Sequence, residues 1–330
     1  MEFTLSDFNF TLPDELIAQH PATPRDHSRL LVYDRETGVI TDDYFYNLHK
    51  YLPQGSTLVV NNSKVDKSRL LFGSKEVFIT SQYNDRTVEA LVRPGKKFKK
   101  DQVVKLTDEI NVKVVEVLDD GQRRLEFNLP LNDLHFEAHR LTPFPPYIKQ
   151  DESLAERYQT VYALHQGSKA APTAGLHFTD EVFNKLKKKN IIRAEVTLHV
   201  GLGTFAPVKN EKLENKLHSE QYEMDQPTAD QLNAAKNIVA VGTTSARVLE
   251  SNIIKEGKFT AGKNQTDIFI KPGFKFKAIN SLVTNFHLPK STLLIMIASL
   301  MGYKEMRKVY DHAIKEKYRF YSFGDAMLIL

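Results

Sequence analysis

The sequence predicts an α/β protein that carries a small, inserted all-β domain with a barrel-like pattern. Strand and helix patterns alternate after Asp151, and this alternation is typical of an α/β domain. Between Arg69 and Asn128, short β-rich runs follow one another without a long helix, which is typical of a small barrel. Residues 1–65 are mixed and too few for a separate domain. We therefore assign residues 1–65 and 150–330 to the α/β domain and residues 66–149 to the inserted domain.

The composition excludes several classes of protein. The 330 residues suffice for two hydrophobic cores. The chain has no cysteine, which excludes disulfides, thiolate nucleophiles and cysteine-ligated metals. Its longest apolar run, Leu293–Met301, is too short to span a bilayer. The first ten residues do not resemble a signal peptide, so we expect a cytoplasmic protein. The net charge of +4 is compatible with RNA binding but does not argue for it.

The N-terminal part and the β-rich part contain clear strand and turn signals. A hairpin is expected at Arg29–Asp34 and Val39–Thr41, and a strand at Thr57–Asn61. In the inserted domain we expect strands at Glu76–Thr80, Thr87–Val92, Gln102–Leu106, Asn111–Leu118 and Arg123–Leu129. A cluster of basic residues lies in the same domain and is typical of a solvated face; it comprises Arg93, Lys96, Lys97, Lys99 and Lys100.

The second half of the chain alternates between helices and strands. We expect helices at Asp151–Tyr162, Asp180–Lys189, Ala246–Glu256 and Thr292–Met301. The expected strands are Ile191–Val200, Ile238–Gly242, Ser281–Asn285 and the apolar end, Ala326–Leu330. In open α/β sheets, ligand sites gather at the ends of such strands.

Two histidines are candidates for chemistry. His177 lies in the small-residue stretch Gly167–Thr179, just before a helix N-terminus. The alternative is a buried loop whose histidine bonds to the backbone. His199 falls on the polar face of its strand, beside Gly201-Leu202-Gly203.

A hydroxyl-rich strand-to-helix turn, Thr243-Thr244-Ser245 with Arg247 behind it, is a possible anion site. It lacks the glycine spacing of a phosphate loop, and simple helix capping explains it equally well. The sequence has no His-Glu-x-x-His motif and no Gly-x-Ser-x-Gly elbow, so we expect neither a metal site nor a serine triad.

Several separated motifs, in order, resemble the S-adenosylmethionine:tRNA ribosyltransferase-isomerase family of queuosine synthesis. They are Leu16–Leu31, Arg157–Ala163 (RYQTVYA), Ala170–Thr179, Val196–Phe205 (VTLHVGLGTF), Val241–Ser251 (VGTTSARVLES), Thr284–Leu294 (TNFHLPKSTLL) and Tyr318–Leu328 (YRFYSFGDAML). The similarity spans nearly the whole chain. The sequence departs from the family at Lys169, at Ala206 and at Asp66-Lys67-Ser68, where we expect valine, arginine and a more apolar stretch, respectively.

The resemblance implies an enzyme that transfers and isomerises the ribosyl part of S-adenosylmethionine onto the aminomethyl-deazaguanine base at the tRNA wobble position. S-adenosylmethionine is then a co-substrate rather than a permanently bound cofactor, tRNA is the partner, and we expect a monomer. Carried onto this sequence, the catalytic candidates are His177, His199 and Asp325. The substrate-binding candidates are Pro172, Thr173, Gly175, Thr243, Thr244, Ser245, Arg247, Asn285, His287 and Arg319.

Two other functions remain open from the sequence. One is an S-adenosylmethionine-dependent RNA methyltransferase, although the usual glycine-rich loop after a first strand is missing. The other is a non-catalytic RNA-binding relative, which the departures at Lys169 and Ala206 would fit. The small molecules released in the reaction distinguish all three.

Overall fold

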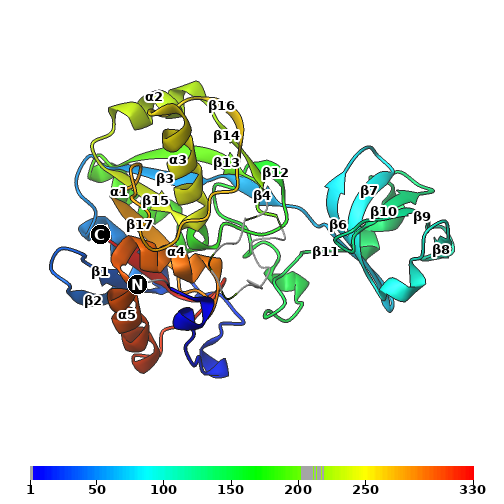
Figure 1. Ribbon diagram of the computed structural model, residues 1–330, viewed down its shortest axis with the longest axis horizontal. Helices are drawn as coiled ribbons and strands as arrows, with labels where there is room; N and C mark the ends of the chain where they lie inside the picture. The colour runs from blue at the N-terminus through cyan, green and yellow to red at the C-terminus, as the bar shows by residue number, and fades with distance from the viewer. Residues whose placement is uncertain (1–2, 202–210, 212, 214–216, 218) are drawn as a thin grey trace. The chain divides into compact units, whose positions relative to one another are not determined.

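The computed structural model describes residues 3–201, 211, 213, 217 and 219–330. The chain forms two compact units (Figure 1). The α/β unit comprises residues 1–64, 145–149 and 156–330, and the antiparallel unit comprises residues 65–144 and 150–155. No helix in the described part of the chain is long and apolar enough to cross a membrane.

A nine-stranded mixed sheet forms the centre of the α/β unit. Its order is β16-β14-β13-β3-β15-β17-β18-β1-β2, and the four strands from β13 to β17 in this order run parallel. The strands are β1 (Arg29–Tyr33), β2 (Ile40–Tyr44), β3 (Thr57–Asn61), β13 (Ile192–Leu198), β14 (Glu220–Met224), β15 (Ile238–Val241), β16 (Gly262–Thr266), β17 (Ser281–Asn285) and β18 (Ala326–Ile329).

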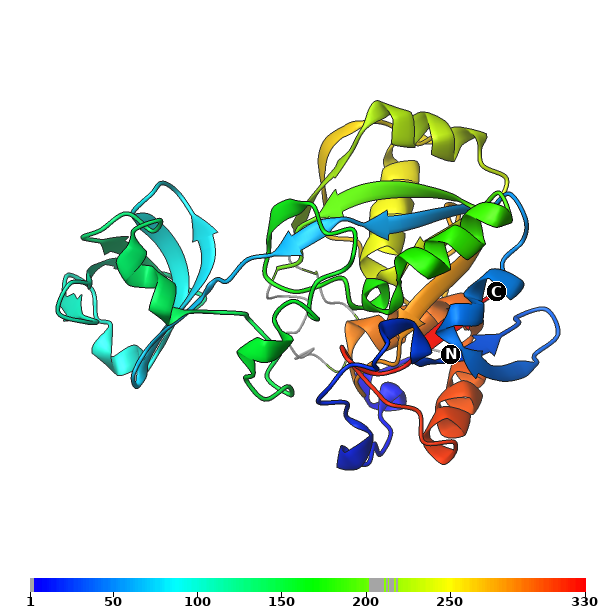
Figure 2. The ribbon, with the colours of Figure 1, turned by 180° about the vertical axis from the view of Figure 1, so that it is seen from behind.

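Both faces of this sheet are covered, because its strands are apolar on both sides. In β3, Val59 packs on one face while Leu58 and Val60 pack on the other. Figure 1 shows the face covered by α3, and Figure 2 shows α1 on the opposite face. The first layer contains α2 (Gln226–Ala234), α3 (Gly242–Glu256), α4 (Thr292–Met301) and α5 (Tyr303–Lys315); the second contains α1 (Asp180–Lys188), η4 (Phe45–Lys50) and η8 (Thr173–His177).

Short elements complete the α/β unit. The strands β4 (Ser63–Val65) and β12 (His165–Ser168) pair in a two-stranded sheet. β4 lies where the first segment of the α/β unit ends. The remaining 3-10 turns here are η1 (Leu5–Phe8), η2 (Asp14–Leu16) and η3 (Arg25–His27).

The antiparallel unit is a seven-stranded sheet that curls around its own core of Phe98, Phe127 and Phe136 (Figure 1). Its strand order is open, β11-β5-β6-β7-β10-β9-β8. The elements are β5 (Arg69–Phe72), β6 (Lys75–Gln82), β7 (Thr87–Arg93), η5 (Gly95–Lys97), β8 (Val103–Lys105), β9 (Asn111–Val117), β10 (Arg123–Phe127), η6 (Leu134–His139), β11 (Arg140–Leu141) and η7 (Glu152–Leu154).

The helix predicted at Asp151–Tyr162 is wrong. The structure has only the three-residue turn η7 there, where the amides of Leu154 and Ala155 bond to carbonyls three residues back, and side chains of the segment bond to distant parts of the chain. Glu152 accepts hydrogen bonds from the backbone N and Oγ1 of Thr142, at 2.8 and 3.1 Å. Arg157 donates to the carbonyl of Ala22 at 2.6 Å.

The start of α3 also differs from the prediction. The helix begins at Gly242 instead of Ala246, so the hydroxyl residues Thr243–Ser245 form its first turn. Gly242 has a φ of +85°, a conformation that glycine adopts without steric cost, and this turns the chain from β15 directly into the helix. As a result, the N-terminus of α3 lies at the carboxyl end of β15.

Candidate active site

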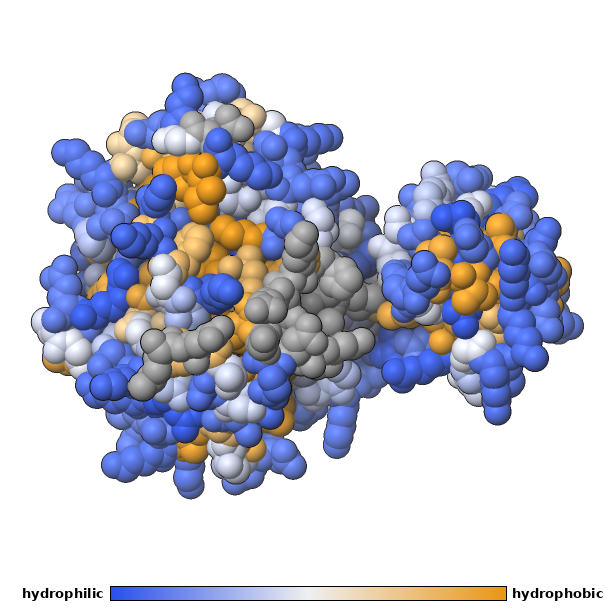
Figure 3. Space-filling view, in the orientation of Figure 1, coloured by the Kyte–Doolittle hydropathy of each residue, from blue (hydrophilic) through white to orange (hydrophobic). Residues whose placement is uncertain are grey.

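A cavity of about 380 Å³ lies at the carboxyl ends of β15 and β17. Its walls come from the first turn of α3, the segment Thr284–Leu293, the loop Ala171–Ala174, and Tyr147 and Tyr321. Hydrophobic residues gather on this side of the unit in the region of α3 and α4 (Figure 3). The size and the mostly apolar lining are typical of a small-molecule site.

Two helix N-termini border the cavity. Thr243 and Thr244 belong to the first turn of α3, and Ser291 caps α4 by accepting a hydrogen bond from the amide of Leu294 at 3.1 Å. Helix N-termini carry partial positive charge and free amides. The Thr244 side chain is buried, and its Oγ1 has no hydrogen-bond partner among the residues described. This corner of the cavity is therefore suited to an anionic or hydrogen-bonding ligand group.

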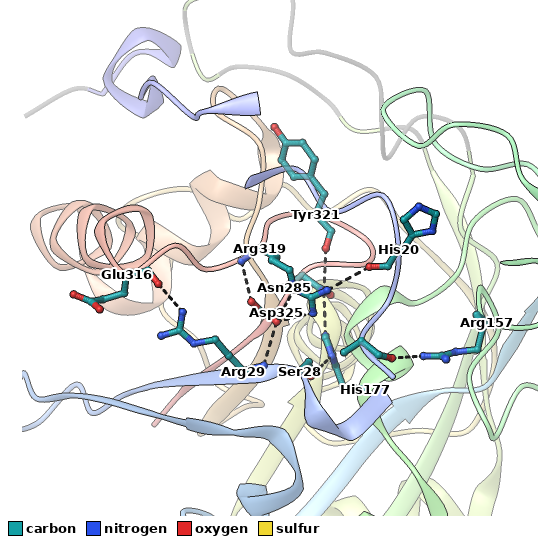
Figure 4. Close-up of polar contacts among 11 residues, drawn as sticks. His20, Ser28, Arg29, Arg157, His177, Asn285, Glu316, Arg319, Tyr321 and Asp325 are labelled. Atoms are coloured by element: carbon teal, nitrogen blue, oxygen red, sulfur yellow. Dashed lines mark hydrogen bonds and ion pairs between the residues drawn. The ribbon is translucent and has the colours of Figure 1, made fainter. Parts of the chain in front are cut away.

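Asn285, the last residue of β17, presents a second buried polar atom to the cavity. Its Nδ2 donates to the carbonyl of Tyr321 at 3.2 Å and to Nε2 of His177 at 3.1 Å (Figure 4). Because a carbonyl can only accept, these two bonds fix the amide orientation. The opposite atom, Oδ1, is buried and has no partner within the described ranges. Asn285 can therefore accept a hydrogen bond from a ligand.

His177 lies behind Asn285 and does not line the cavity. Its side chain is 4% exposed, its Nδ1 lies 2.7 Å from Oγ of Ser28, and its ring packs on Phe45. Since Asn285 donates to Nε2, the ring carries its proton on Nδ1 and donates to Ser28. Burial lowers the pKa of His177 to about 4, although the charge of Asp325 acts in the opposite direction. The ring is therefore neutral near pH 7 and holds Asn285 in place.

His287 lines the cavity directly. Its Nε2 lies 2.7 Å from Oγ1 of Thr284, and its backbone amide donates to the hydroxyl of Tyr310 at 3.0 Å. Burial lowers the pKa of His287 to about 3. The structure thus places a neutral imidazole in the wall of the cavity, where it can form a hydrogen bond with a ligand.

Asp325 and Arg319 form an ion pair near His177 and Asn285 (Figure 4). Nη2 of Arg319 lies 2.8 Å from Oδ1 of Asp325. The buried carboxylate also accepts hydrogen bonds from the backbone amides of Arg29 and Arg319, at 3.1 and 2.9 Å. Arg319 in turn donates to the carbonyl of His20 at 3.3 Å. In this structure, Asp325 therefore ties the start of β1 to the segment before β18.

His199 is separated from this site. It follows β13 and borders a polar groove with Thr197 and Gln221, and it is not among the residues that line the cavity. Its ring packs against Gly167: a Cβ atom added there would lie 3.1 Å from the ring. The small residue at Gly167 thus makes room for His199.

Three other candidates are buried in packing. Arg247 forms an ion pair with Glu220 at 2.5 Å, and both side chains are 6% exposed. Gly175 packs under Tyr162, whose hydroxyl would clash with an added Cβ. Ser245 is fully buried. Of the predicted substrate-binding residues, the structure places Pro172, Thr173, Thr243, Thr244, Asn285 and His287 in the cavity wall.

The sequence reasoning missed the aromatic part of the cavity. Tyr147 and Tyr321 lie with ring centroids 4.7 Å apart, and the hydroxyl of Tyr147 bonds to Oγ of Ser322 at 2.8 Å. Burial raises the pKa of Tyr147 to about 12. Tyr321 and Ser322 belong to one of the family motifs, but no local pattern marks Tyr147. Of the departures noted above, Lys169 donates its backbone amide to Val200, while Ala206 lies outside the described residues.

These features define an open-sheet α/β protein with a small-molecule site at the carboxyl ends of its parallel strands. The sequence model of the family described as "Queuosine biosynthesis protein" matches residues 5–329. Proteins named S-adenosylmethionine:tRNA ribosyltransferase-isomerase are similar over nearly their whole length. The one from Clostridioides difficile is 45% identical, with 98% of each chain covered, and the one from Carboxydothermus hydrogenoformans is 46% identical, with 99% of each covered.

A solved structure is also similar. The crystal structure of S-adenosylmethionine tRNA ribosyltransferase from Thermotoga maritima matches with a TM-score of 0.58 and 37% identity, covering 98% of this chain and 100% of that one. This chain belongs to the queuosine biosynthesis protein family.

Proposed function

We propose that this chain transfers and isomerises the ribosyl part of S-adenosylmethionine onto the aminomethyl-deazaguanine base at the wobble position of tRNA. The products are epoxyqueuosine-tRNA, adenine and methionine. Full-length relatives that are 45% and 46% identical carry the name of this activity. The substrate implies a cytoplasmic enzyme, and we propose that it acts as a monomer with S-adenosylmethionine as a co-substrate.

S-adenosylmethionine binds, in this proposal, in the cavity at the ends of β15 and β17. One observation supports this most directly: Oγ1 of Thr244 and Oδ1 of Asn285 are buried in the cavity wall and have no hydrogen-bond partner in the described part of the chain. Unpaired buried polar atoms are costly, and a ligand that bonds them removes that cost. The α3 N-terminus suits the methionine carboxylate, and the rings of Tyr147 and Tyr321 suit adenine or the sulfonium cation.

The reaction needs a base that removes a proton from the ribose carbon next to the sulfonium. His287 lines the cavity as a neutral imidazole, which supports a hydrogen-bonding role toward the substrate. Because its pKa is lowered to about 3, the ring is a weak base near pH 7, and we do not assign it this proton transfer. His177 supports the site through Asn285, whose amide it orients. The proposed roles of His199 and Asp325 remain predictions, since His199 borders a different groove and Asp325 has its contacts with Arg29 and Arg319.

The antiparallel unit is proposed as an inserted, barrel-like domain that binds tRNA. Its sequence, residues 65–144, is flanked on both sides by segments of the α/β unit. All the basic side chains of the cluster Arg93–Lys100 are exposed, and none forms an ion pair with a described residue. They are therefore available for phosphates.

The first test is incubation of the protein with S-adenosylmethionine and tRNA carrying the aminomethyl-deazaguanine base, followed by mass spectrometry of nucleosides and small molecules. Epoxyqueuosine with adenine and methionine is the expected result. S-adenosylhomocysteine with a methylated base would instead assign a methyltransferase. Bound tRNA without any product would assign a non-catalytic relative.

The second test concerns the cavity. Thr244→Val keeps the shape of the side chain but removes its hydroxyl, and we expect it to raise KM for S-adenosylmethionine roughly tenfold, the size of one hydrogen bond to a charged group. Ser245→Ala is the matched control, because Ser245 is the next residue, is also buried and does not line the cavity. An equal KM in the two variants would show that the hydroxyl of Thr244 does not bind S-adenosylmethionine.

A further inference from the structure

An exposed row of aromatic rings lies next to the site, at the end of β2. The rings of Tyr44 and Tyr46 are nearly parallel, with centroids 5.6 Å apart and an interplanar angle of 4°. His27 continues the row, 5.1 Å from Tyr46. Tyr44 is 47% exposed, so part of its ring faces solvent. We call the three rings of His27, Tyr44 and Tyr46 the aromatic row.

The register of the sheet places the aromatic row at the same end of the strands as the cavity. Tyr44 pairs with Arg29 in β1, the next residue of β1 pairs with Ala326 in β18, and Ala326 pairs with Asn285. Tyr44 is thus three strand spacings from Asn285, roughly 14 Å across the sheet. Between them, the ring of Phe45 contacts the ring of His177 at 5.1 Å.

Lysines and carboxylates both lie beside the aromatic row, and the amide of Tyr44 donates to Oδ1 of Asp43 at 2.7 Å. Nζ of Lys185 lies 5.6 Å from the ring centroid of Tyr46 and also pairs with Glu181 at 3.0 Å. Burial, followed by the charges of Lys185, Lys189 and Lys50, lowers the pKa of the neighbouring His49. Lys50, Lys185 and Lys189 therefore bring positive charge to this side of η4, where Glu181 compensates Lys185.

We propose that the aromatic row is a stacking platform for an unpaired nucleobase that flanks the reacting base in single-stranded RNA. Aromatic rings beside cations are the recurrent means of binding single-stranded nucleic acid, because every base has a face to stack and every nucleotide has a phosphate. The inference rests on the proposed function, since it takes the anticodon loop as the RNA. The alternative to RNA binding is that the tyrosines only shield the edge strand β2.

The test uses an RNA stem-loop with the anticodon sequence, in which 2-aminopurine replaces the base on one or the other side of the wobble position. The protein has no tryptophan to obscure this probe. Tyr44→Ala should weaken RNA binding roughly 5- to 100-fold, the range for loss of one base–aromatic stack. It should also abolish the quenching of 2-aminopurine at one of the two positions.

Two further variants serve as controls. Tyr44→Phe keeps the ring and should keep wild-type affinity and quenching. Val39→Ala changes another exposed residue of the same hairpin, just before the opposite end of β2, and should behave as wild type. Affinity for S-adenosylmethionine should be the same in all four proteins, because none of the changes is in the cavity wall.

The outcomes separate this inference from the proposed function. Equal RNA affinity and equal quenching in wild type and Tyr44→Ala would overturn the platform while leaving the reaction intact. A wild-type protein that releases no adenine would refute the proposed function. The RNA-binding and quenching measurements would still show whether the aromatic row stacks on a base. A wild-type protein that does not bind the stem-loop would overturn both.

Discussion

His177 and His287 show how burial determines chemistry at single residues. Both imidazoles are buried, and burial lowers their pKa values from about 6.5 to about 4 and about 3. Neutral rings can accept hydrogen bonds, as His177 does from Asn285, whereas their lowered pKa values make them weak bases near pH 7. The same burial makes the folded protein sensitive to acid, because each histidine is easier to protonate after unfolding.

The sign of this pH dependence follows from linkage. Between about pH 6.5 and pH 4, the unfolded chain binds protons at His177 that the folded chain does not, so stability is full above about 6.5 and falls as the pH is lowered. At pH 5 we expect a loss of about 2 kcal/mol from His177 relative to pH 7.5. Urea unfolding at both pH values should show that His177→Gln has a shallower pH dependence than wild type by this amount. Parallel curves for the two proteins would contradict the assignment.

At the scale of elements, the ion pair between Glu220 and Arg247 joins β14 to α3. Arg247 belongs to one of the family motifs and is predicted from the sequence to bind an anion. In the structure, its charge is already compensated by a carboxylate at 2.5 Å, in surroundings where both side chains are buried. A buried charge that loses its partner is costly, so each residue depends on the other.

Removing one partner should therefore affect stability more than binding. We expect Glu220→Gln to lower the free energy of unfolding by about 3–5 kcal/mol. Adding Arg247→Met to this variant should recover part of the loss, because no unpaired charge then remains. Chemical denaturation of the two single variants and the double variant measures this coupling. KM for S-adenosylmethionine should remain unchanged in Arg247→Met. A marked increase in KM would show that Arg247 contributes to substrate binding.

At the scale of the whole molecule, the chain divides its residues between a unit with a cavity and a unit with an exposed basic cluster. The cluster is exposed because Phe98, in its middle, is anchored in the hydrophobic core while the lysines around it point to solvent. This local anchoring presents Lys96, Lys97, Lys99 and Lys100 together without neutralising carboxylates within the described ranges.

If this cluster binds tRNA phosphates, the salt dependence of binding reports it. Lys96→Gln combined with Lys97→Gln should reduce the slope of log K against log salt by about 1 for each phosphate that the variant no longer neutralises. The control combines Lys304→Gln with Lys315→Gln on the exposed side of α5, which removes the same charge elsewhere. Filter binding of tRNA across a salt series is the measurement. Equal slopes in the two double variants would exclude the cluster.

Hydrophobic periodicity is sufficient to locate most of the elements that position the cavity. The predicted strands Thr57–Asn61, Ile238–Gly242 and Ser281–Asn285 and the predicted helix Thr292–Met301 match the observed elements within one residue at each end. Each contains a run of apolar residues bounded by polar residues or glycine. The helix predicted for the segment Asp151–Tyr162 is wrong: its backbone forms only short 3-10 turns, and the side chains of Glu152 and Arg157 bond to residues distant in the sequence, which a local pattern does not reveal.

By itself, the sequence determined the α/β class, the β-rich segment and the family, since apolar periodicity and ordered motifs are properties of the chain alone. Only the tertiary structure decided which polar residues meet. Asn285 reaches His177 because β17 ends beside η8, while His199 ends a strand further along the sheet and borders a different groove. Strand order and register bring together residues far apart in the chain, and hydrogen bonds and ion pairs form only at contact distance, so local patterns cannot assign them.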